Sequence, residues 1–311
     1  MKGLANKGHT CYFNAALQCL AYCPNMSNYF LSGRAAEDAN PKLKGASALA
    51  AAYADFVRDY WTVEGAAADP SAVYAAFVKA CRGFTPSRQH DAHEAMVCLL
   101  DKLHDGLSRF KPGDVSAVFA KSMTDTGRKA WRDRLRGAAS VVSEVFTGQI
   151  EAHVQGDGYS SVTYDHFTCL SLAVSGASLA ACMQRHMASE PLSDFKVDGN
   201  ATAVQLSKRF TYLPRILVIH LKRFDGSDKI DKFIDYPAEL DLGAFACPGC
   251  EHHYQLFAVC LHRGTADDGH YTTCGEVKGR WYAMDDEAVA HMPNINDIIQ
   301  RDAYVLLYKR L

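Results

Sequence analysis

The chain changes its pattern of apolar residues near Val141, and this change limits the folds available to it. Before that point apolar side chains recur at helical spacing, as in Cys11–Ala21, where Phe13, Leu17 and Leu20 form one stripe. After it, β-branched and aromatic residues dominate short runs that are separated by turn residues. Helices followed by strands predict an α+β protein. Strands that pair across such sequence distances further predict a single interdependent domain over residues 1–311.

The two patterns predict individual elements. Helices are expected over Cys11–Ala21, with Thr10 as its cap, and over Ala46–Trp61, Ser71–Ala80, His90–His104 and Leu179–Met187. Strands are expected, in a mainly antiparallel sheet, over Val142–Val154, Tyr159–Leu172, Val204–Leu213, Ile216–Phe224, Tyr254–His262, His270–Val277, Arg280–Met284 and Ala303–Lys309. The basic segment Arg128–Arg136 is interpreted as a solvated helix face in preference to a binding patch.

Composition argues against several classes of protein. With 33 basic and 35 acidic residues the net charge is -2, which gives no reason to expect a nucleic acid or an anionic membrane as partner. No apolar run is long enough to span a bilayer. The first residues, MKGLANKGHT, contain no apolar core of a signal peptide. Eleven irregularly spaced cysteines in such a chain predict free thiols in a reducing compartment, so we expect an intracellular protein, cytoplasmic or nuclear.

Cys11 stands where a helix is expected to begin, directly after the polar loop at residues 6–10. A helix N-terminus or a nearby imidazolium lowers the pKa of a thiol and so favours the nucleophilic thiolate. Position alone is a weak argument, because most cysteines are buried as small apolar side chains. The sequence therefore needs a base and an orienting group elsewhere before Cys11 can be read as a nucleophile.

Both groups are present near the other end of the chain. His270 begins one expected strand, and Asp285 and Asp286 follow the next one. In an antiparallel hairpin the start of one strand lies beside the end of its neighbour, so a carboxylate can orient the imidazole. We expect this carboxylate to bind Nδ1 and to leave Nε2 facing the thiol. A thiol, an imidazole and a carboxylate are the components of a papain-type site.

Several segments resemble the ubiquitin-specific proteases. GLANKGHTCYFNAALQCL resembles the segment that carries the family's nucleophile, and YQLFAVCLHRGTADDGHYTTCGEVKGRWYAMDDEAV resembles the segment that carries its histidine. RQHDAHEAMVCLLDKLH is similar to the family's Gln-x-Asp-x-x-Glu helix. FTGQI, LPRILVIHLKRF and AYVLLYKR resemble further family segments, and all of them occur in family order. The resemblance covers essentially the whole chain.

This resemblance implies a papain-like fold with a helical thumb at about residues 1–140, fingers mostly at 141–213 and a palm mostly at 214–311. It also implies hydrolysis of the (iso)peptide bond after the last glycine of ubiquitin. Cys11 is then the nucleophile, His270 the base and Asp285 the orienting group. Asn6 corresponds to the residue that stabilises the oxyanion, together with the backbone N–H of Cys11, and Asp286 to a supporting residue behind the catalytic groups.

The same resemblance implies a binding site for the ubiquitin tail, formed by Gln89, Asp91, Glu94, His262 and Tyr271. His93 stands where the family usually has a glutamine. Two alternatives stay open at this point. The chain could be a catalytically weak scaffold that binds ubiquitin, or a protease for a ubiquitin-like modifier.

The chain departs from many relatives in the fingers, where two Cys-x-x-Cys pairs hold a structural zinc ion. The corresponding stretches, Glu151–Val154 and Phe195–Asp198, contain no cysteine. We therefore expect no zinc in the fingers and no cofactor. The chain's one Cys-x-x-Cys, formed by Cys247 and Cys250, lies outside the fingers and is interpreted as a Pro-Gly turn in preference to a metal site.

Overall fold

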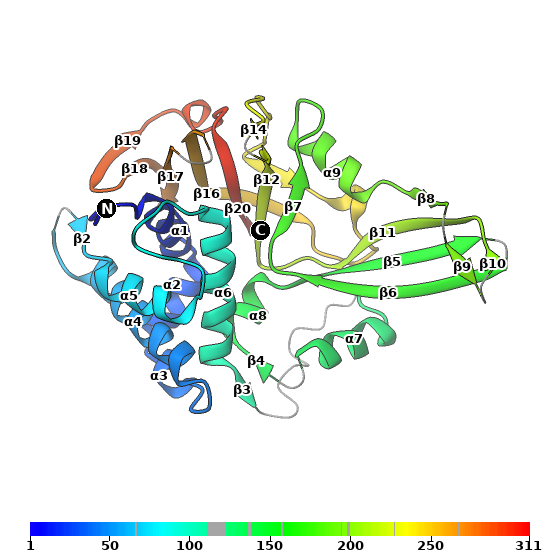
Figure 1. The fold of residues 1–311 in the computed structure, drawn as a ribbon, viewed down its shortest axis with the longest axis horizontal. Helices are drawn as coiled ribbons and strands as arrows, with labels where there is room; N and C mark the ends of the chain where they lie inside the picture. Colours follow the sequence, from blue (N-terminus) through cyan, green and yellow to red (C-terminus); the bar gives the residue numbers. More distant parts are fainter. Residues whose placement is uncertain are drawn as a thin grey trace.

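The computed structural model describes residues 1–65, 67–110, 122–135, 138–156, 158–193, 195–197, 200–226, 228–265 and 268–311. Among these residues, most of the helices gather at one end of the molecule and a narrow four-stranded sheet extends from the other (Figure 1). A larger sheet lies between them. The expected order, helices first and then mainly antiparallel strands, is confirmed in outline.

The helices are α1 (Cys11–Ala21), α2 (Pro24–Leu31), α3 (Arg34–Glu37), α4 (Lys44–Thr62), α5 (Ser71–Ala80), α6 (Ala92–Leu107), α7 (Asp125–Leu135), α8 (Val141–Phe146) and α9 (Leu179–Met187). The bounds predicted for α1, α5 and α9 are confirmed at both ends. Helix α6 begins at Ala92, later than expected, because Asp91 is its N-cap. Among the described residues, none of these helices has both the length and the apolar character that a membrane span requires.

The large sheet has the strand order β19 (Ala288–Met292), β18 (Arg280–Asp285), β17 (Gly269–Val277), β16 (His253–Gly264), β20 (Ala303–Arg310), β12 (Ile216–Lys222) and β7 (Leu170–Ala173). Strand β15 (Glu239–Asp241) also pairs with β16. Neighbours are antiparallel except β12 and β7, which run parallel. The helix-bearing end of the molecule covers this sheet through α1, whose neighbours are α6 and β17.

The narrow sheet has the order β6 (Tyr159–Phe167), β5 (Gly148–Gly156), β11 (Val204–Tyr212) and β8 (Glu190–Leu192). Short two-stranded pairs complete the described strands. They are β1 (Gly3–Leu4) with β2 (Ala67–Ala68), β3 (Arg109–Phe110) with β4 (Ala138–Ala139), β9 (Lys196–Val197) with β10 (Asn200–Ala201), and β13 (Phe224–Asp225) with β14 (Asp228–Lys229).

Helix α1 is buried along its whole length, with no exposed face. It packs closely on β17 because Gly275 has no side chain there: a Cβ at that position would lie 2.7 Å from Cδ2 of Tyr22. The stripe of Phe13, Leu17 and Leu20 predicted one buried face, so the helix is buried more completely than its sequence indicated. This packing fixes the N-terminus of α1, and with it Cys11, beside the start of β17.

Two of the predicted strands are wrong in part. The valines of Val142–Val154 suggested a strand from the start, but the first residues form α8, which Ser140 caps by accepting a hydrogen bond from the Ser143 N–H. The expected strand Tyr159–Leu172 is two strands, β6 and β7, which belong to different sheets. In both places local side-chain type matched a strand, while capping and sheet pairing decided the outcome.

The basic segment lies on α7 as far as Leu135, and Arg136 is outside the described residues. The side chains of Lys129, Arg132 and Arg134 are exposed, and Trp131 on the same helix is buried. This agrees with the expected solvated helix face.

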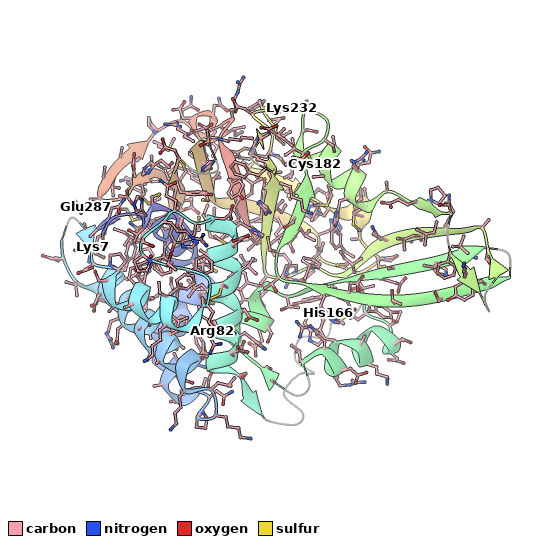
Figure 2. The ribbon with its side chains drawn as sticks, in the orientation of Figure 1. Lys7, Arg82, His166, Cys182, Lys232 and Glu287 are labelled. Carbon is pink, nitrogen blue, oxygen red and sulfur yellow. A yellow bond between two sulfur atoms is a disulfide. The ribbon has the colours of Figure 1, made fainter. Side chains whose placement is uncertain are left out.

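The expectation of free thiols is wrong for one pair of cysteines. Cys81, directly after α5, and Cys98, on α6, form a disulfide. The other nine cysteines are free. One of them, Cys182, is labelled on α9 in Figure 2. The bond joins α6 to the residue after α5, and the loop that carries Gln89 lies between the two cysteines.

Candidate active site

Cys11 is the first residue of α1, and only 5% of it is exposed. Thr10 occupies the N-cap position, but its side chain makes no capping hydrogen bond to the helix. Instead Thr10 Oγ1 donates to Asn6 Oδ1 (3.1 Å) and accepts from the Lys7 N–H (3.2 Å). Thr10 therefore holds the expected cap position, and its carbonyl accepts the Asn14 N–H (2.9 Å) of the helix. Its side chain does not cap the helix but fixes the loop before Cys11.

Asn6 is the centre of that loop. Its Oδ1 accepts the Gly8 N–H (2.9 Å) as well as the Thr10 hydroxyl, and its Nδ2 donates to Asp286 Oδ2 (2.7 Å). Gly8 has φ +121°, a conformation that favours glycine and lets the loop turn back on Asn6. The amide orientation of Asn6 is thus set from both sides.

His270 and Asp285 lie on adjacent strands, near the start of β17 and at the end of β18. His270 Nε2 donates to Asp285 Oδ1 at 2.6 Å. The sequence expected the carboxylate on Nδ1, so the assignment of the two ring nitrogens is reversed. The backbone N–H of Tyr271, the next residue, interacts with the Cys11 sulfur, which places the thiol against the main chain of this strand. The bond to Asp285 leaves Nδ1 as the other ring nitrogen of His270.

Asp286 has a different set of contacts from Asp285. Its Oδ1 accepts from Asn14 Nδ2 (2.8 Å) and its Oδ2 from Asn6 Nδ2. Its main-chain oxygen accepts the Leu4 N–H (2.7 Å), which joins β1 to the turn after β18. Its φ of +47° is unusual for a residue other than glycine. A carboxylate oxygen of Asp286 nevertheless lies within 4.8 Å of one from Asp285 and of a His270 ring nitrogen, so these three residues form one group of potential metal ligands. The following residue, Glu287, is labelled close to Lys7 in Figure 2, where these two loops meet.

The electrostatics of Cys11 differ from the expectation for a helix N-terminus. Burial raises the pKa of the thiol, and the negative charge of Asp286 adds to that rise. Backbone N–H groups of Tyr271, Tyr12 and Cys11 itself act in the opposite direction but do not prevail. In this state the neutral thiol is favoured at pH 7. Such a thiol needs a proton acceptor before it can attack as a thiolate.

A model of the ubiquitin carboxyl-terminal hydrolase family matches residues 2–308. The chain belongs to this family.

Curated family members align over almost the whole chain. Ubiquitin carboxyl-terminal hydrolase 2 of Bos taurus is 30% identical over 99% of this chain and 55% of its own length. Ubiquitin carboxyl-terminal hydrolase Usp2 of Drosophila melanogaster is 27% identical over 99% of this chain and 34% of its own length. The chain thus spans about a third to a half of the length of these two relatives.

Solved structures of the hydrolase family share the fold. The Ubp8-containing SAGA DUB module bound to monoubiquitin matches with a TM-score of 0.81 and 22% identity, over 100% of this chain and 69% of the matched chain. The same module bound to ubiquitin aldehyde matches with a TM-score of 0.82 and 22% identity, over 100% of this chain and 70% of the matched chain. This likeness confirms the predicted α+β fold class of the ubiquitin-specific proteases.

The residues that family resemblance assigned to the substrate tail lie on α6, on the loop before it and on β16 and β17. Asp91 Oδ1 accepts the Glu94 N–H (2.9 Å), and Asp91 Oδ2 accepts the hydroxyl of Tyr304. Glu94 is exposed. Gln89 Oε1 accepts the Gly269 N–H at 3.1 Å. Gln89 therefore bridges the loop before α6 to the residue before His270.

His262 and Tyr271 are buried beneath Gly269. Their rings lie 4.4 Å apart, and both rings also contact that of Tyr304. A Cβ on Gly269 would lie 2.1 Å from His262 Nε2, so only glycine fits above this imidazole. Burial lowers the pKa of His262 to about 4, and the nearby charge of Lys229 contributes to this shift. His262 is thus a neutral ring that shapes the floor of this region.

The possible zinc ligands Cys247 and Cys250 follow the short helix η2 (Gly243–Phe245). The Cys250 N–H donates to the Cys247 carbonyl (3.1 Å), as in a tight turn, and Gly249 has φ +82°. Among the described residues, neither thiol belongs to a group of three or more potential metal ligands. The predicted Pro-Gly turn agrees with this geometry.

Sequence reasoning missed three residues of this site. Asn14 binds Asp286 from one turn further along α1, Tyr304 binds Asp91, and His220 stacks on His93 with ring centroids 3.8 Å apart. The only available sign of Asn14 was that it is one of two polar residues, with Gln18, on a mainly apolar helix. Nothing in the sequence indicated that Tyr304 and His220, which lie on neighbouring strands far along the chain, meet the N-cap and first turn of α6.

Proposed function

We propose that this chain is a thiol-dependent hydrolase that cleaves the (iso)peptide bond after the C-terminal glycine of ubiquitin. The observation that carries the proposal is the joint placement of Cys11, the His270–Asp285 pair and the Asn6–Asp286 pair at one end of α1. These groups supply a nucleophile, an oriented base and an oriented amide donor. Acyl transfer requires all three.

The chemistry follows from the hydrogen bonds. Asp285 holds the proton of His270 on Nε2, so Nδ1 is free to accept the proton of the Cys11 thiol. The sulfur then attacks the carbonyl carbon of the terminal glycine, and the carbonyl oxygen becomes an oxyanion. Asn6 Nδ2 and the Cys11 N–H are the donors for that oxyanion. His270 next protonates the leaving amine, and water, activated by the same imidazole, releases the glycine carboxylate and regenerates the thiol.

Three observations support ubiquitin as the substrate. Two solved structures that share this fold, of the Ubp8-containing SAGA DUB module, are bound to monoubiquitin and to ubiquitin aldehyde. In this chain Asp91 and Glu94 lie at the start of α6, with the side chain of Glu94 exposed. Carboxylates there suit the basic residues near the end of ubiquitin. Because Gly269 has no side chain, its backbone lies close to His262, which leaves room for a substrate tail that ends in glycine.

The test is cleavage of fluorogenic ubiquitin, compared with fluorogenic ubiquitin-like modifiers at equal concentration. Wild type should release fluorophore from ubiquitin, while Cys11→Ala should be inactive yet still bind ubiquitin in a direct binding assay. A wild-type chain that binds ubiquitin without turnover would be a scaffold. Faster cleavage of another modifier would reassign the substrate. Turnover above a tenth of wild type in Cys11→Ala would overturn the nucleophile.

A further inference from the structure

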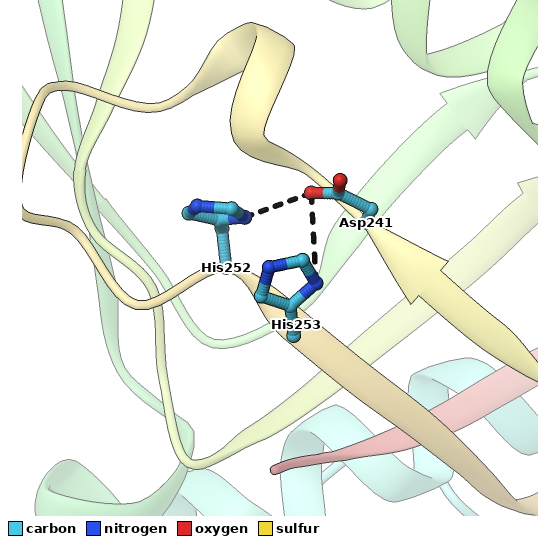
Figure 3. A group of neighbouring side chains, drawn as sticks. All are labelled: Asp241, His252 and His253. Carbon is cyan, nitrogen blue, oxygen red and sulfur yellow. Dashed lines mark hydrogen bonds and ion pairs between the residues drawn. The ribbon is translucent and has the colours of Figure 1, made fainter.

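A second group of potential metal ligands lies away from the catalytic residues, where β15 ends and β16 begins. Asp241, His252 and His253 bring one carboxylate oxygen and two imidazole nitrogens within 4.8 Å of one another (Figure 3). His252 Nδ1 lies 2.7 Å and His253 Nδ1 3.9 Å from the same oxygen, Asp241 Oδ1. Figure 3 shows both rings turned toward that oxygen from the same side.

We propose that Asp241, His252 and His253 bind a divalent transition-metal ion of the zinc class, with water completing its coordination. Two imidazoles and one carboxylate are ligands that such ions favour. Neighbouring ligand atoms of a tetrahedral zinc ion lie about 3.3 Å apart, given bonds of about 2.0–2.1 Å. The observed 2.7 and 3.9 Å bracket that value, and all three ligand atoms lie within 4.8 Å of one another, so side-chain rotations can bring them to coordination distance.

The backbone already holds these ligands in place. Asp241 and His253 are directly paired residues of β15 and β16, so their side chains leave the sheet on the same side. The Leu242 N–H donates to the His252 carbonyl (3.1 Å), which fixes the residue before the strand. The Gly243 N–H donates to Asp241 Oδ1 (2.8 Å) and orients the carboxylate, as outer contacts of metal ligands commonly do.

Gly243 also leaves the space that the site requires. A Cβ at this position would lie 2.9 Å from Cε1 and 3.0 Å from Nδ1 of His252, and 3.1 Å from Asp241 Oδ1. A larger residue would therefore push these two ligands apart. All three ligands are reachable by solvent ions, since Asp241 and His253 are exposed and His252 is partly exposed.

The site would fasten a loop of the large sheet that also contacts the narrow one. Residues 242–252 connect β15 to β16, and within this loop the Cys247 N–H donates to the Phe210 carbonyl of β11 (2.8 Å). A metal ion that joins Asp241 to both histidines closes the base of this loop. Binding only to the folded chain should raise its melting temperature.

The test uses the untagged, metal-stripped chain. Calorimetric titration with Zn²⁺ should give one site in wild type that Asp241→Asn and His252→Ala weaken by at least about tenfold, a loss that even outer-shell changes can cause. Gly243→Ala should weaken it without removing a ligand. His291→Ala, an exposed histidine on β19, is the matched control and should bind as wild type. Zn²⁺ should raise the melting temperature of wild type and of this control equally, and that of the weakened variants less.

Competing sites are separated by Co²⁺ absorption and by two further variants. Binding at nitrogen and oxygen gives weak visible bands, whereas thiolate ligands add intense charge-transfer absorption in the near ultraviolet. Wild type should show the first pattern, unchanged in Cys11→Ser and in Cys247→Ser. Charge-transfer bands that vanish in either serine variant, or Zn²⁺ affinity unchanged in both Asp241→Asn and His252→Ala, would overturn the proposal. The proposal would also be overturned if wild type had no Zn²⁺ site stronger than the one in Asp241→Asn.

Discussion

Asn6 is held by Asp286 and not by Asp285: Asn6 Nδ2 donates to Asp286 Oδ2 at 2.7 Å, while Asp285 is committed to His270. Two adjacent carboxylates thus orient two different groups of the candidate site. The left-handed backbone of Asp286 makes this division possible, because it turns the second side chain toward the loop before α1.

The first prediction follows from this pairing. Asn6→Ala and Asp286→Ala should each lower kcat by roughly 10²-fold, the effect typical of losing one oxyanion donor. Because Asp286 acts through Asn6, the double variant should be little worse than the more damaging single one. Initial rates on fluorogenic ubiquitin measure all three variants. A double variant whose loss equals the product of the two single losses would mean that the residues act independently.

Asp285 should respond differently to its two simplest substitutions. Asp285→Asn keeps an oxygen that can accept the His270 Nε2 proton, whereas Asp285→Ala leaves the ring unsupported. We expect the larger loss of kcat from Ala and the milder one from Asn, with KM little changed in both. Steady-state kinetics decide the matter. A larger loss of kcat in Asp286→Ala than in Asp285→Ala would contradict the assignment of Asp285 as the residue that orients His270.

The raised pKa of Cys11 predicts how the thiol reacts with an alkylating agent. Since burial favours the neutral thiol, the alkylation rate of the ligand-free protein should be low at pH 7 and climb as pH rises. Asp286→Asn removes a negative charge that contributes to this rise, so Cys11 should be alkylated faster at pH 8 although turnover falls. Mass spectrometry of the Cys11 peptide gives both rates. An equal or slower rate in Asp286→Asn would contradict the electrostatic assignment.

Asp91 should combine a structural and a recognition role. Asp91→Ala removes the cap of α6 and should cost about 1 kcal/mol of stability. Asp91→Asn keeps an oxygen for the Glu94 N–H but removes the charge, so its KM for ubiquitin should rise about tenfold, equivalent to 1.4 kcal/mol, with little change in Tm. Tyr304→Phe keeps the charge and should leave KM near wild type. An unchanged KM in Asp91→Asn would reduce Asp91 to a cap.

The buried imidazoles predict sensitivity to acid. Burial lowers the pKa of His220 to about 3, and the stacked ring of His93 and the charge of Lys222 add to this. Because the folded pKa lies below the unfolded value of about 6.5, stability from the neutral ring is complete above pH 6.5 and is lost as pH falls toward 3. His220→Gln should flatten the fall in unfolding free energy between pH 6.5 and 4.5, measured by urea titration. His9→Gln, an exposed control, should not.

Much of the fold and the main catalytic groups could be predicted from local sequence. Helix α1 and the strands that carry His270 and Asp285 have clear periodicity, and hairpin geometry brings the last two together. The ring nitrogen was assigned wrongly because strand pairing fixes which residues meet and leaves the rotation of a side chain open. The α8 error has a similar cause, since valines favour a strand locally while the Ser140 cap starts a helix.

Other parts of the site depend on contacts between distant segments. Tyr304 reaches Asp91 across 213 positions, and Asn6 reaches Asp286 across 280. Neither pair has a local pattern, because the partners meet only when the large sheet and the helices pack together. The Cys81–Cys98 bond was also missed, because a separation of 17 residues across a helix and a loop does not by itself indicate pairing.

That disulfide has a practical consequence for anyone who handles the protein. Thiol enzymes are ordinarily kept in reductant so that the nucleophile stays active, and here the same reductant can open the bond between Cys81 and Cys98. The loop between these cysteines carries Gln89, which contacts the residue before His270. Storage buffer therefore selects between two covalent forms of the molecule. Rates measured in different laboratories will be comparable only when the redox history of each sample is matched.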